Sequence, residues 1–410
     1  MSSIDLIIDA RVSAEVASQI EQTVVVAKGE RGEKGDRGVD GSRASFPPWT
    51  SAPGHFAEGY SAYASAKEGL SQRLSDLIKP SAAKLVHPDP MPGAHSNSFS
   101  AVVRMPDSGS YFLVPYSSAT ARIYRSRTGK FVTPGGAYAG AGAHNGGALM
   151  PSGRIMMAPH NSTSLIAYNP SWELVETLKT DLPGNSAYTG VVVTRNGLAV
   201  FVPHNASRVG VFLESETTWS FGSDEIGGGM SYAGGVALPD GKVLMVPHCA
   251  SRAAVYDPDT NATTLGAQQF PASESFFGGA LIDDTKVMLF PHKHGMPAIY
   301  DFVSDILTPF PAHVGDAGVA NFAGGVALPD GRFFLVPFQS TVGKIIDLGS
   351  NNARSTPGTY GGGACHGGVL MDDGDVLMAP FNSENAFFAA TGYGVPLDVE
   401  FVTSPHNNRS

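Results

Sequence analysis

The chain has 410 residues, of which 42% are hydrophobic, which is enough to bury a substantial core and excludes a disordered protein. Its formal net charge of -10 argues against a nucleic-acid partner, because phosphate binding needs a concentrated basic surface. The 49 glycines and 29 prolines predict many short strands joined by tight turns.

Residues 1–28 form the first predicted segment. Asp5 and Asp9 lie inside its short apolar run, so the sequence predicts neither a secretory signal nor membrane insertion. We therefore expect the chain to be made and folded in a cytoplasm. Apolar residues recur at helical spacing from Val12 to Val24, and we interpret residues 1–28 as an anchoring end.

Residues 29–43 carry glycine at every third position, with charged or small residues between. Collagen needs this pattern because only a hydrogen atom fits at the axis where three chains meet. A flexible charged linker is the alternative. The triplet positions are Gly29, Gly32, Gly35, Gly38 and Gly41.

Residues 44–94 contain a run with the alternating spacing of four and three that is typical of a coiled coil. Lys67 interrupts the apolar seam, and Pro80 ends the predicted helix. A helix docked on its own globular domain is the alternative. Beside the glycine triplets, the pattern favours a homotrimer with a helical and collagen-like stem. The predicted seam residues are Phe56, Tyr60, Tyr63, Leu70, Leu74 and Leu77.

Residues 95–410 repeat one pattern seven times. The recurring proline stands at Pro115, Pro159, Pro203, Pro247, Pro291, Pro337 and Pro380, with successive differences of 44, 44, 44, 44, 46 and 43. A glycine precedes the proline by thirteen residues in every unit except the first. So regular a period indicates a repeat architecture.

Each unit predicts four antiparallel strands joined by turns. Asn196-Gly197 and Asp240-Gly241 supply the positive φ of a tight hairpin, and the apolar second strand predicts burial on both faces. Seven such units form an all-β, seven-bladed β-propeller. A linear solenoid is the alternative. Cys249 and Cys365 fall in non-adjacent units, so we expect reduced thiols.

The segment "LPDGKVLMVPHCASRAAVYDPDTNATTLG" resembles the kelch repeat of galactose-oxidase-like propellers, over roughly residues 95–405. The chain departs from that family because Pro-His or Pro-Phe replaces the paired glycines that end the second kelch strand. The family's copper site has no match in this sequence. The resemblance therefore implies the fold and little of the chemistry, and we expect no cofactor and no metal.

The order of stem and β-rich domain is similar to that of bacteriophage tail fibres and receptor-binding proteins. This resemblance implies a virion protein that is anchored to a baseplate, tail or head protein through residues 1–28. Its propeller would attach to a bacterial surface glycan or protein receptor. A head-attached fibre or decoration protein is an alternative.

The candidate receptor-binding residues lie on the face where the second strand ends. Four consecutive units place histidine directly after the proline, and asparagine follows in three units. Three interpretations stay open: a metal site, structural histidines that hydrogen-bond their own loops, and a glycan-binding platform. The candidates are His144, His160, Asn161, His204, Asn205, His248, His292, Phe338, His366 and Phe381.

Catalysis is not expected, because glycan hydrolysis needs two facing carboxylates and this face is short of acids. The recurring aspartates, such as Asp240, fall in the hairpin turns of the opposite face. No Gly-x-Ser-x-Gly motif with a set of partners occurs. A polysaccharide depolymerase that uses Glu225 or Glu274 is the remaining alternative.

Overall fold

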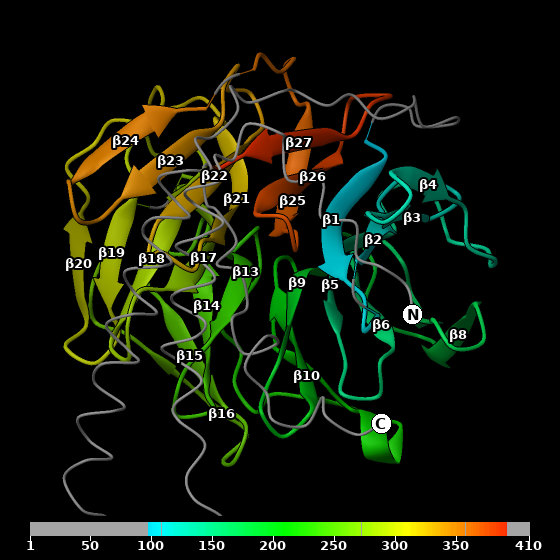
Figure 1. Cartoon of the computed structure of the whole chain (residues 1–410). Helices are drawn as coiled ribbons and strands as arrows, with labels where there is room; N and C mark the ends of the chain where they lie inside the picture. The colour runs from blue at the N-terminus through cyan, green and yellow to red at the C-terminus, as the bar shows by residue number, and fades with distance from the viewer. Residues whose placement is uncertain (1–96, 108, 272, 357, 392–410) are drawn as a thin grey trace, which may run out of the picture. The chain divides into compact units, whose positions relative to one another are not determined.

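The computed structural model describes residues 97–107, 109–271, 273–356 and 358–391. These residues form seven antiparallel sheets arranged around an axis (Figure 1). In each sheet the strands pair in chain order, so every sheet is one blade. The described residues contain no α-helix. The predicted seven-bladed β-propeller is therefore confirmed.

The first four blades have four strands each. Blade 1 contains β1 (Phe99–Arg104), β2 (Ser110–Pro115), β3 (Arg122–Arg125) and β4 (Lys130–Val132). Blade 2 contains β5 (His144–Leu149), β6 (Ile155–Pro159), β7 (Leu165–Asn169) and β8 (Leu174–Lys179). Blade 3 contains β9 (Tyr188–Val193), β10 (Leu198–Pro203), β11 (Gly210–Leu213) and β12 (Thr218–Phe221), with a short 3₁₀ helix at Glu214–Glu216. Blade 4 contains β13 (Tyr232–Ala237), β14 (Val243–Pro247), β15 (Ala254–Asp257) and β16 (Ala262–Leu265).

The last three blades continue the pattern. Blade 5 contains β17 (Phe276–Leu281), β18 (Lys286–Pro291), β19 (Ala298–Asp301) and β20 (Ile306–Pro309). Blade 6 contains β21 (Phe322–Ala327), β22 (Phe333–Pro337), β23 (Lys344–Asp347) and β24 (Asn352–Ser355). Blade 7 contains β25 (Cys365–Leu370), β26 (Asp375–Pro380) and β27 (Phe387–Ala390) within the described residues.

This topology gives the propeller two distinct faces. We call the side with the second-to-third strand loops and the blade-to-blade connections the loop face. The side with the hairpin turns between the first and second strands, and between the third and fourth, is the turn face. The recurring proline ends each second strand at the loop face.

Apolar residues fill every interface between neighbouring blades. Each second strand is buried over nearly its whole length, as its sequence predicts. Each interface holds its own hydrophobic cluster. One of them joins Phe99 and Leu113 of blade 1 to Leu377 and Phe388 of blade 7, so the ring is closed. The alternative of an open solenoid is therefore wrong.

Glycine at the start of the first strand lets the blades approach the axis. Gly146 has φ +98°, and a Cβ atom there would lie 2.9 Å from the Cα of Gly190 in the next blade. A side chain would therefore both strain the backbone and collide with the neighbouring blade. In blade 1 the hairpin turn between β1 and β2 is one residue longer than in blade 2, so Ala101 takes the glycine position.

The first hairpin turn differs in detail from the prediction. Only the glycines, Gly197 and Gly241, have positive φ, while Asn196 and Asp240 do not. The Gly241 amide donates to the Leu238 carbonyl (3.0 Å), and the Lys242 carbonyl accepts from the Leu238 amide (2.8 Å). The connection is thus a four-residue turn with glycine in the left-handed region.

Several predictions fall on residues outside the described ranges. These are the anchoring segment 1–28, the collagen-like segment 29–43, and the coiled coil and linker 44–94. Within the described ranges, no helix is long and apolar enough to cross a membrane. Cys249 and Cys365 are both free thiols, as expected.

Candidate functional site

The residue after each recurring proline belongs to a closed ring of aromatic side chains on the loop face. Neighbouring ring centroids are 5.4 to 6.0 Å apart around all seven blades. Each second strand ends at its proline, and the next side chain turns toward the axis. We call this set the loop-face ring: Tyr116, His160, His204, His248, His292, Phe338 and Phe381.

The four histidines of this ring tie each blade to the next. Nδ1 of His160 donates to the Tyr188 carbonyl at 2.9 Å, and His204, His248 and His292 make the same bond to the following blade at 3.0, 2.9 and 2.5 Å. The histidines are hydrogen-bonded, as the structural interpretation expects. The predicted partner is wrong, because each bond goes to the neighbouring blade and not to the histidine's own loop. A carbonyl can only accept, so Nδ1 carries the proton and Nε2 is an acceptor.

Burial keeps these imidazoles neutral. The side chains of His160 and His248 are 5% and 4% exposed, and burial lowers the pKa of each to about 4. Burial also lowers the pKa values of His204 and His292. The four imidazoles of the ring are therefore uncharged at neutral pH, and little of their surface is exposed.

His144 and His366 occupy different environments, although the sequence predicts them on one face. His366 lines the axis, where its Nδ1 donates to the Ser100 carbonyl (2.8 Å) and burial lowers its pKa to about 4. His144 is fully buried between blades, and its pKa is also lowered to about 4 by burial, with the Pro115 carbonyl acting in the opposite direction. Its placement on the binding face is therefore wrong.

The candidates Asn161 and Asn205, and Asn382 at the equivalent position of blade 7, bridge loops of neighbouring blades. Oδ1 of Asn161 accepts from the Ser186 amide (2.8 Å), and its Nδ2 donates to the Ala141 carbonyl (3.0 Å). Asn205 repeats this arrangement with the next pair of loops. Asn382 accepts from the Asn97 amide (2.9 Å) across the interface between blades 7 and 1.

A metal centre finds no support in the described part of the chain. No group of three or more histidine, cysteine, aspartate or glutamate side chains there could hold a metal ion. The reason is the ring itself, because it spaces consecutive imidazoles evenly around the axis instead of converging them on one point. The Nε2 atoms of the ring histidines therefore do not converge on one point where a metal ion could bind.

The carboxylates named for a depolymerase are already paired. Glu274 lies 2.7 Å from Lys293, whose hydrogen bond holds its pKa below the usual range. Glu225 lies 3.3 Å from Arg208 and is exposed. A general acid needs a raised pKa, so Glu274 is unsuited to that role. Asp240 pairs with Lys242 on the turn face, as its place in the hairpin predicts.

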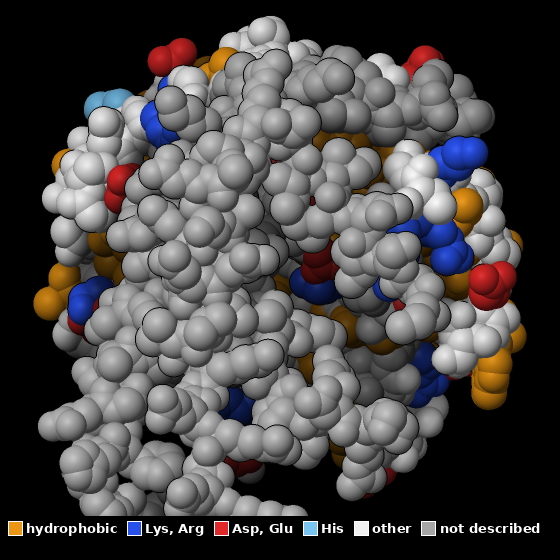
Figure 2. Space-filling model, viewed as in Figure 1, with side chains coloured by type: hydrophobic (Ala, Val, Ile, Leu, Met, Phe, Trp, Pro, Cys, Tyr) orange, Lys and Arg blue, Asp and Glu red, His pale blue; other side chains and the backbone are white. Residues whose placement is uncertain are grey.

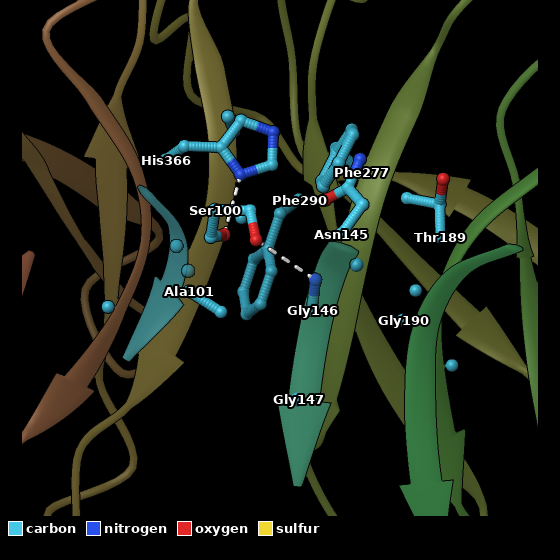
Figure 3. Close-up of a pocket in the computed structure, with 18 of the residues that line it drawn as sticks. Ser100, Ala101, Asn145, Gly146, Gly147, Thr189, Gly190, Phe277, Phe290 and His366 are labelled. Carbon is cyan, nitrogen blue, oxygen red and sulfur yellow. Dashed lines mark hydrogen bonds between the residues drawn. The ribbon is translucent and has the colours of Figure 1, made fainter. Parts of the chain in front are cut away.

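An axial cavity of about 240 Å³ is lined by the first strands (Figure 3). Its wall combines the inner-strand glycines with the residues that precede them, among which Asn145, Thr189 and Phe277 were not predicted as site residues. Their sequence signal is their position directly before the recurring glycine. Among the described residues that line the cavity, none is an aspartate, glutamate, lysine or arginine.

Comparisons with known proteins identify the fold alone. No family model and no curated protein matches the chain. A virginiamycin B lyase from Staphylococcus aureus superposes on 75% of this chain and 99% of its own, with a TM-score of 0.62 and 12% identity. A streptogramin B lyase gives a TM-score of 0.61 at 11% identity, over 75% of this chain and 97% of its own.

A galactose-oxidase-like propeller is also among the similar structures. A fungal alcohol oxidase of the AA5 family, in complex with copper, covers 76% of this chain and 77% of its own, with a TM-score of 0.56 and 14% identity. The class of protein that these comparisons define is a seven-bladed β-propeller. At these identities the activities of the neighbours do not transfer to this chain.

Proposed function

We propose that this protein is a bacteriophage fibre that attaches to a bacterial surface glycan through the loop face of its propeller, without catalysis. The observation that supports this best is the closed loop-face ring, which is rigid, neutral and aromatic. Aromatic side chains and neutral hydrogen-bonding groups suit a sugar, which has apolar C–H faces and hydroxyl edges.

The charge of the ring itself is consistent with a neutral receptor. Figure 2 shows acidic and basic side chains of both signs around the edge of one side of the molecule. The ring histidines are held neutral by burial. Recognition on the loop face therefore rests on shape and hydrogen bonding.

The fibre half of the proposal rests on sequence. The glycine triplets and the adjacent heptads favour a parallel homotrimer, and three propellers would combine weak contacts into avidity. Light scattering of the full chain should then report three protomers. A monomeric full chain would refute the stem.

Exposed side chains on the two faces allow a matched test of attachment. Met230 and Val319, both 41% exposed, lie in loop-face connections, whereas Trp172 and Val303, both 71% exposed, lie in turn-face hairpins. We expect Met230→Glu with Val319→Glu to weaken binding to susceptible cells at least about tenfold, equivalent to about 1.4 kcal/mol.

The matched control is Trp172→Glu with Val303→Glu, which should leave cell binding unchanged. Equal effects of both pairs would place recognition away from the loop face. Release of oligosaccharides from purified surface polysaccharide by the wild type would instead establish a depolymerase.

A further inference from the structure

The axial cavity has a polar side and an apolar side. Directly before the inner-strand glycine, consecutive blades 7, 1, 2 and 3 carry His366, Ser100, Asn145 and Thr189, whereas blades 4, 5 and 6 carry alanine, Phe277 and alanine. The polar residues and Phe277 line the cavity (Figure 3). Phe277 and His366 contact each other, with ring centroids 5.0 Å apart, so a ligand held there would meet this aromatic pair together with the polar groups of blades 1 to 3.

Asn145 has hydrogen-bonding capacity that no protein group uses. Its side chain is 8% exposed and lines the cavity. Among the described residues, no hydrogen bond to its side-chain amide is present. Buried polar groups are almost always paired, so an amide with one donor group and one acceptor facing a cavity indicates a partner from outside the chain.

Nε2 of His366 is a second atom that can bond a ligand. Because Nδ1 donates to the Ser100 carbonyl and the imidazole is neutral, Nε2 is an acceptor. By contrast, the Ser100 hydroxyl is engaged, since it donates to the His144 carbonyl (3.0 Å) and accepts from the Gly146 amide (3.2 Å). The Thr189 hydroxyl is engaged as well, since it lies 3.3 Å from Nδ1 of His160. Asn145 and His366 are thus the groups with unused capacity for a ligand.

The loop-face ring is filled from below on one side only. Phe277 lies 5.8 and 5.6 Å from His248 and His292, and His366 lies 5.2 Å from Phe381, measured between ring centroids. Among the described residues, neither Phe277 nor His366 makes a ring contact with the aromatic side chains of blades 1 to 3. Asn145 and Thr189, in blades 2 and 3, therefore lie beneath the part of the ring that has no such aromatic contacts.

From these observations we propose that the axial cavity binds one neutral sugar residue. The Asn145 amide bonds two neighbouring hydroxyls, Nε2 of His366 accepts from a third, and Phe277 forms the apolar wall. The cavity volume of about 240 Å³ lies just below the roughly 300 to 1,000 Å³ of sites for drug-sized ligands, which suits a single ring. An acidic sugar is excluded, because its carboxylate would be buried with no cation among the lining residues.

This inference rests on the proposed attachment function and names its ligand class. The direct test is calorimetric titration of the purified full chain with the methyl glycosides of glucose, galactose and mannose, and with N-acetylglucosamine. Glucuronic acid and N-acetylneuraminic acid serve as acidic probes. We expect millimolar binding of at least one neutral sugar and no binding of either acid. Absence of neutral-sugar binding, or equal binding of the acids, overturns the proposal.

Substitutions inside and outside the cavity test where the sugar binds. Asn145→Ala should weaken binding of the neutral sugar at least tenfold, while Asn352→Ala, the same change on exposed strand β24, should leave it unchanged. Equal loss in both variants, or no loss in Asn145→Ala, overturns the assignment. If Asn145→Ala does not fold, Ala323→Val narrows the same cavity from the opposite side and should weaken binding by a similar factor.

Measuring cell binding beside sugar binding distinguishes failure of this inference from failure of the proposed function. If the chain binds cells but no free sugar, the axial pocket is refuted and attachment stands. If it binds a sugar through Asn145 but binds no cells, the pocket stands and attachment falls. If both hold, the free sugar at saturation should compete with cell binding.

Discussion

Two kinds of interface between blades hold the ring together. At six interfaces the chain passes directly from one blade to the next, and at the seventh the last blade packs against the first with no direct chain connection between them. Between blades 2 and 3, the Ala187 amide donates to the His160 carbonyl (2.9 Å). Between blades 7 and 1, the Ser98 amide makes the equivalent bond to Phe381 (2.8 Å).

The closing interface uses the same kinds of contact as the tethered interfaces. Its imidazole bond comes from His366 on the first strand, because Phe381 at the ring position has no donor. On the turn face, the Asp372 amide donates to the Tyr111 hydroxyl (3.0 Å), and Arg104 pairs with the Asp372 carboxylate. Arg154 and Glu214 form a similar pair between blades 2 and 3, so the contacts of the closing interface must also offset the missing tether, since without it the two blades must be brought together against chain entropy.

The largest expected effect comes from removing the closing interface altogether. A chain that ends at Thr356 lacks β25, β26 and β27, so it exposes the apolar sides of blades 6 and 1. We expect the cooperative thermal transition to disappear, because each blade needs both neighbours. Calorimetry of the truncated and complete chains measures this. A truncated chain with an unchanged melting temperature would show that closure is dispensable.

Acid should weaken the imidazole-bonded interfaces of both kinds. His160, His248 and His366 have folded pKa values of about 4, below the unfolded value of about 6.5. Between these values the unfolded chain takes up protons that the folded chain does not, so the stabilisation is complete above about pH 6.5 and is lost as the pH falls through 4. Each histidine contributes at most about 1.4 kcal/mol per pH unit in this window.

Urea denaturation at pH 7.5, 5.5 and 4.5 measures that loss. The free energy of unfolding should already fall between pH 7.5 and 5.5, although Asp375, whose pKa is raised to about 6 by burial, takes up a proton in the folded chain over the same range and partly opposes the loss. A free energy that is constant down to pH 5 would show that the histidines are solvated in the folded protein.

The repeat period predicts the loop-face ring but not its contacts. Seven prolines in register placed His160, His204, His248 and His292 at equivalent positions, and they are neighbours in space. The carbonyl partners lie 28 to 30 residues further along the chain, in the next blade. Only the packing of two complete blades brings them together, so a pattern within one repeat cannot show them.

A shift of one residue explains the failure at His144. His144 stands two residues before Gly146, whereas His366 stands one residue before Gly367. Successive side chains of a strand point to opposite sides, so one is buried between blades and the other lines the axis. Counting from the glycine would have identified Asn145 as the equivalent of His366.

Equivalent histidine variants compare the two interfaces directly. His366→Ala and His160→Ala each leave a buried carbonyl without its donor, which costs about 1 to 3 kcal/mol. We expect the larger loss of unfolding free energy for His366→Ala, because no covalent connection supports the closing interface. Urea denaturation at pH 7.5 measures both, with exposed His313→Ala as the control. A larger loss at His160 would contradict the comparison.

The asparagine bridges offer a smaller and cleaner comparison. Asn382→Ala and Asn161→Ala each remove an acceptor from a loop amide of the next blade, and both side chains are exposed. A hydrogen bond of this kind contributes about 0.5 to 1.5 kcal/mol. We expect the loss of unfolding free energy to lie near the upper end of this range for Asn382→Ala and near the lower end for Asn161→Ala. Thermal melting of the two variants measures this difference. Equal shifts of the melting temperature would show that the chain connection adds nothing to the stability of the interface.

The smallest effect should come from the ion pair on the turn face of the closing interface. The side chains of Arg104 and Asp372 are 50% and 40% exposed, so their coupling should be about 0 to 1 kcal/mol. A double-mutant cycle of Arg104→Ala and Asp372→Ala measures it, and the Arg208–Glu225 pair within blade 3 provides the control cycle. Both couplings should shrink in 1 M salt, since exposed charges are screened. A larger coupling across the closing interface that persists in salt would mean that the pair, and not the Asp372 backbone bond to Tyr111, holds the turn face of the ring shut.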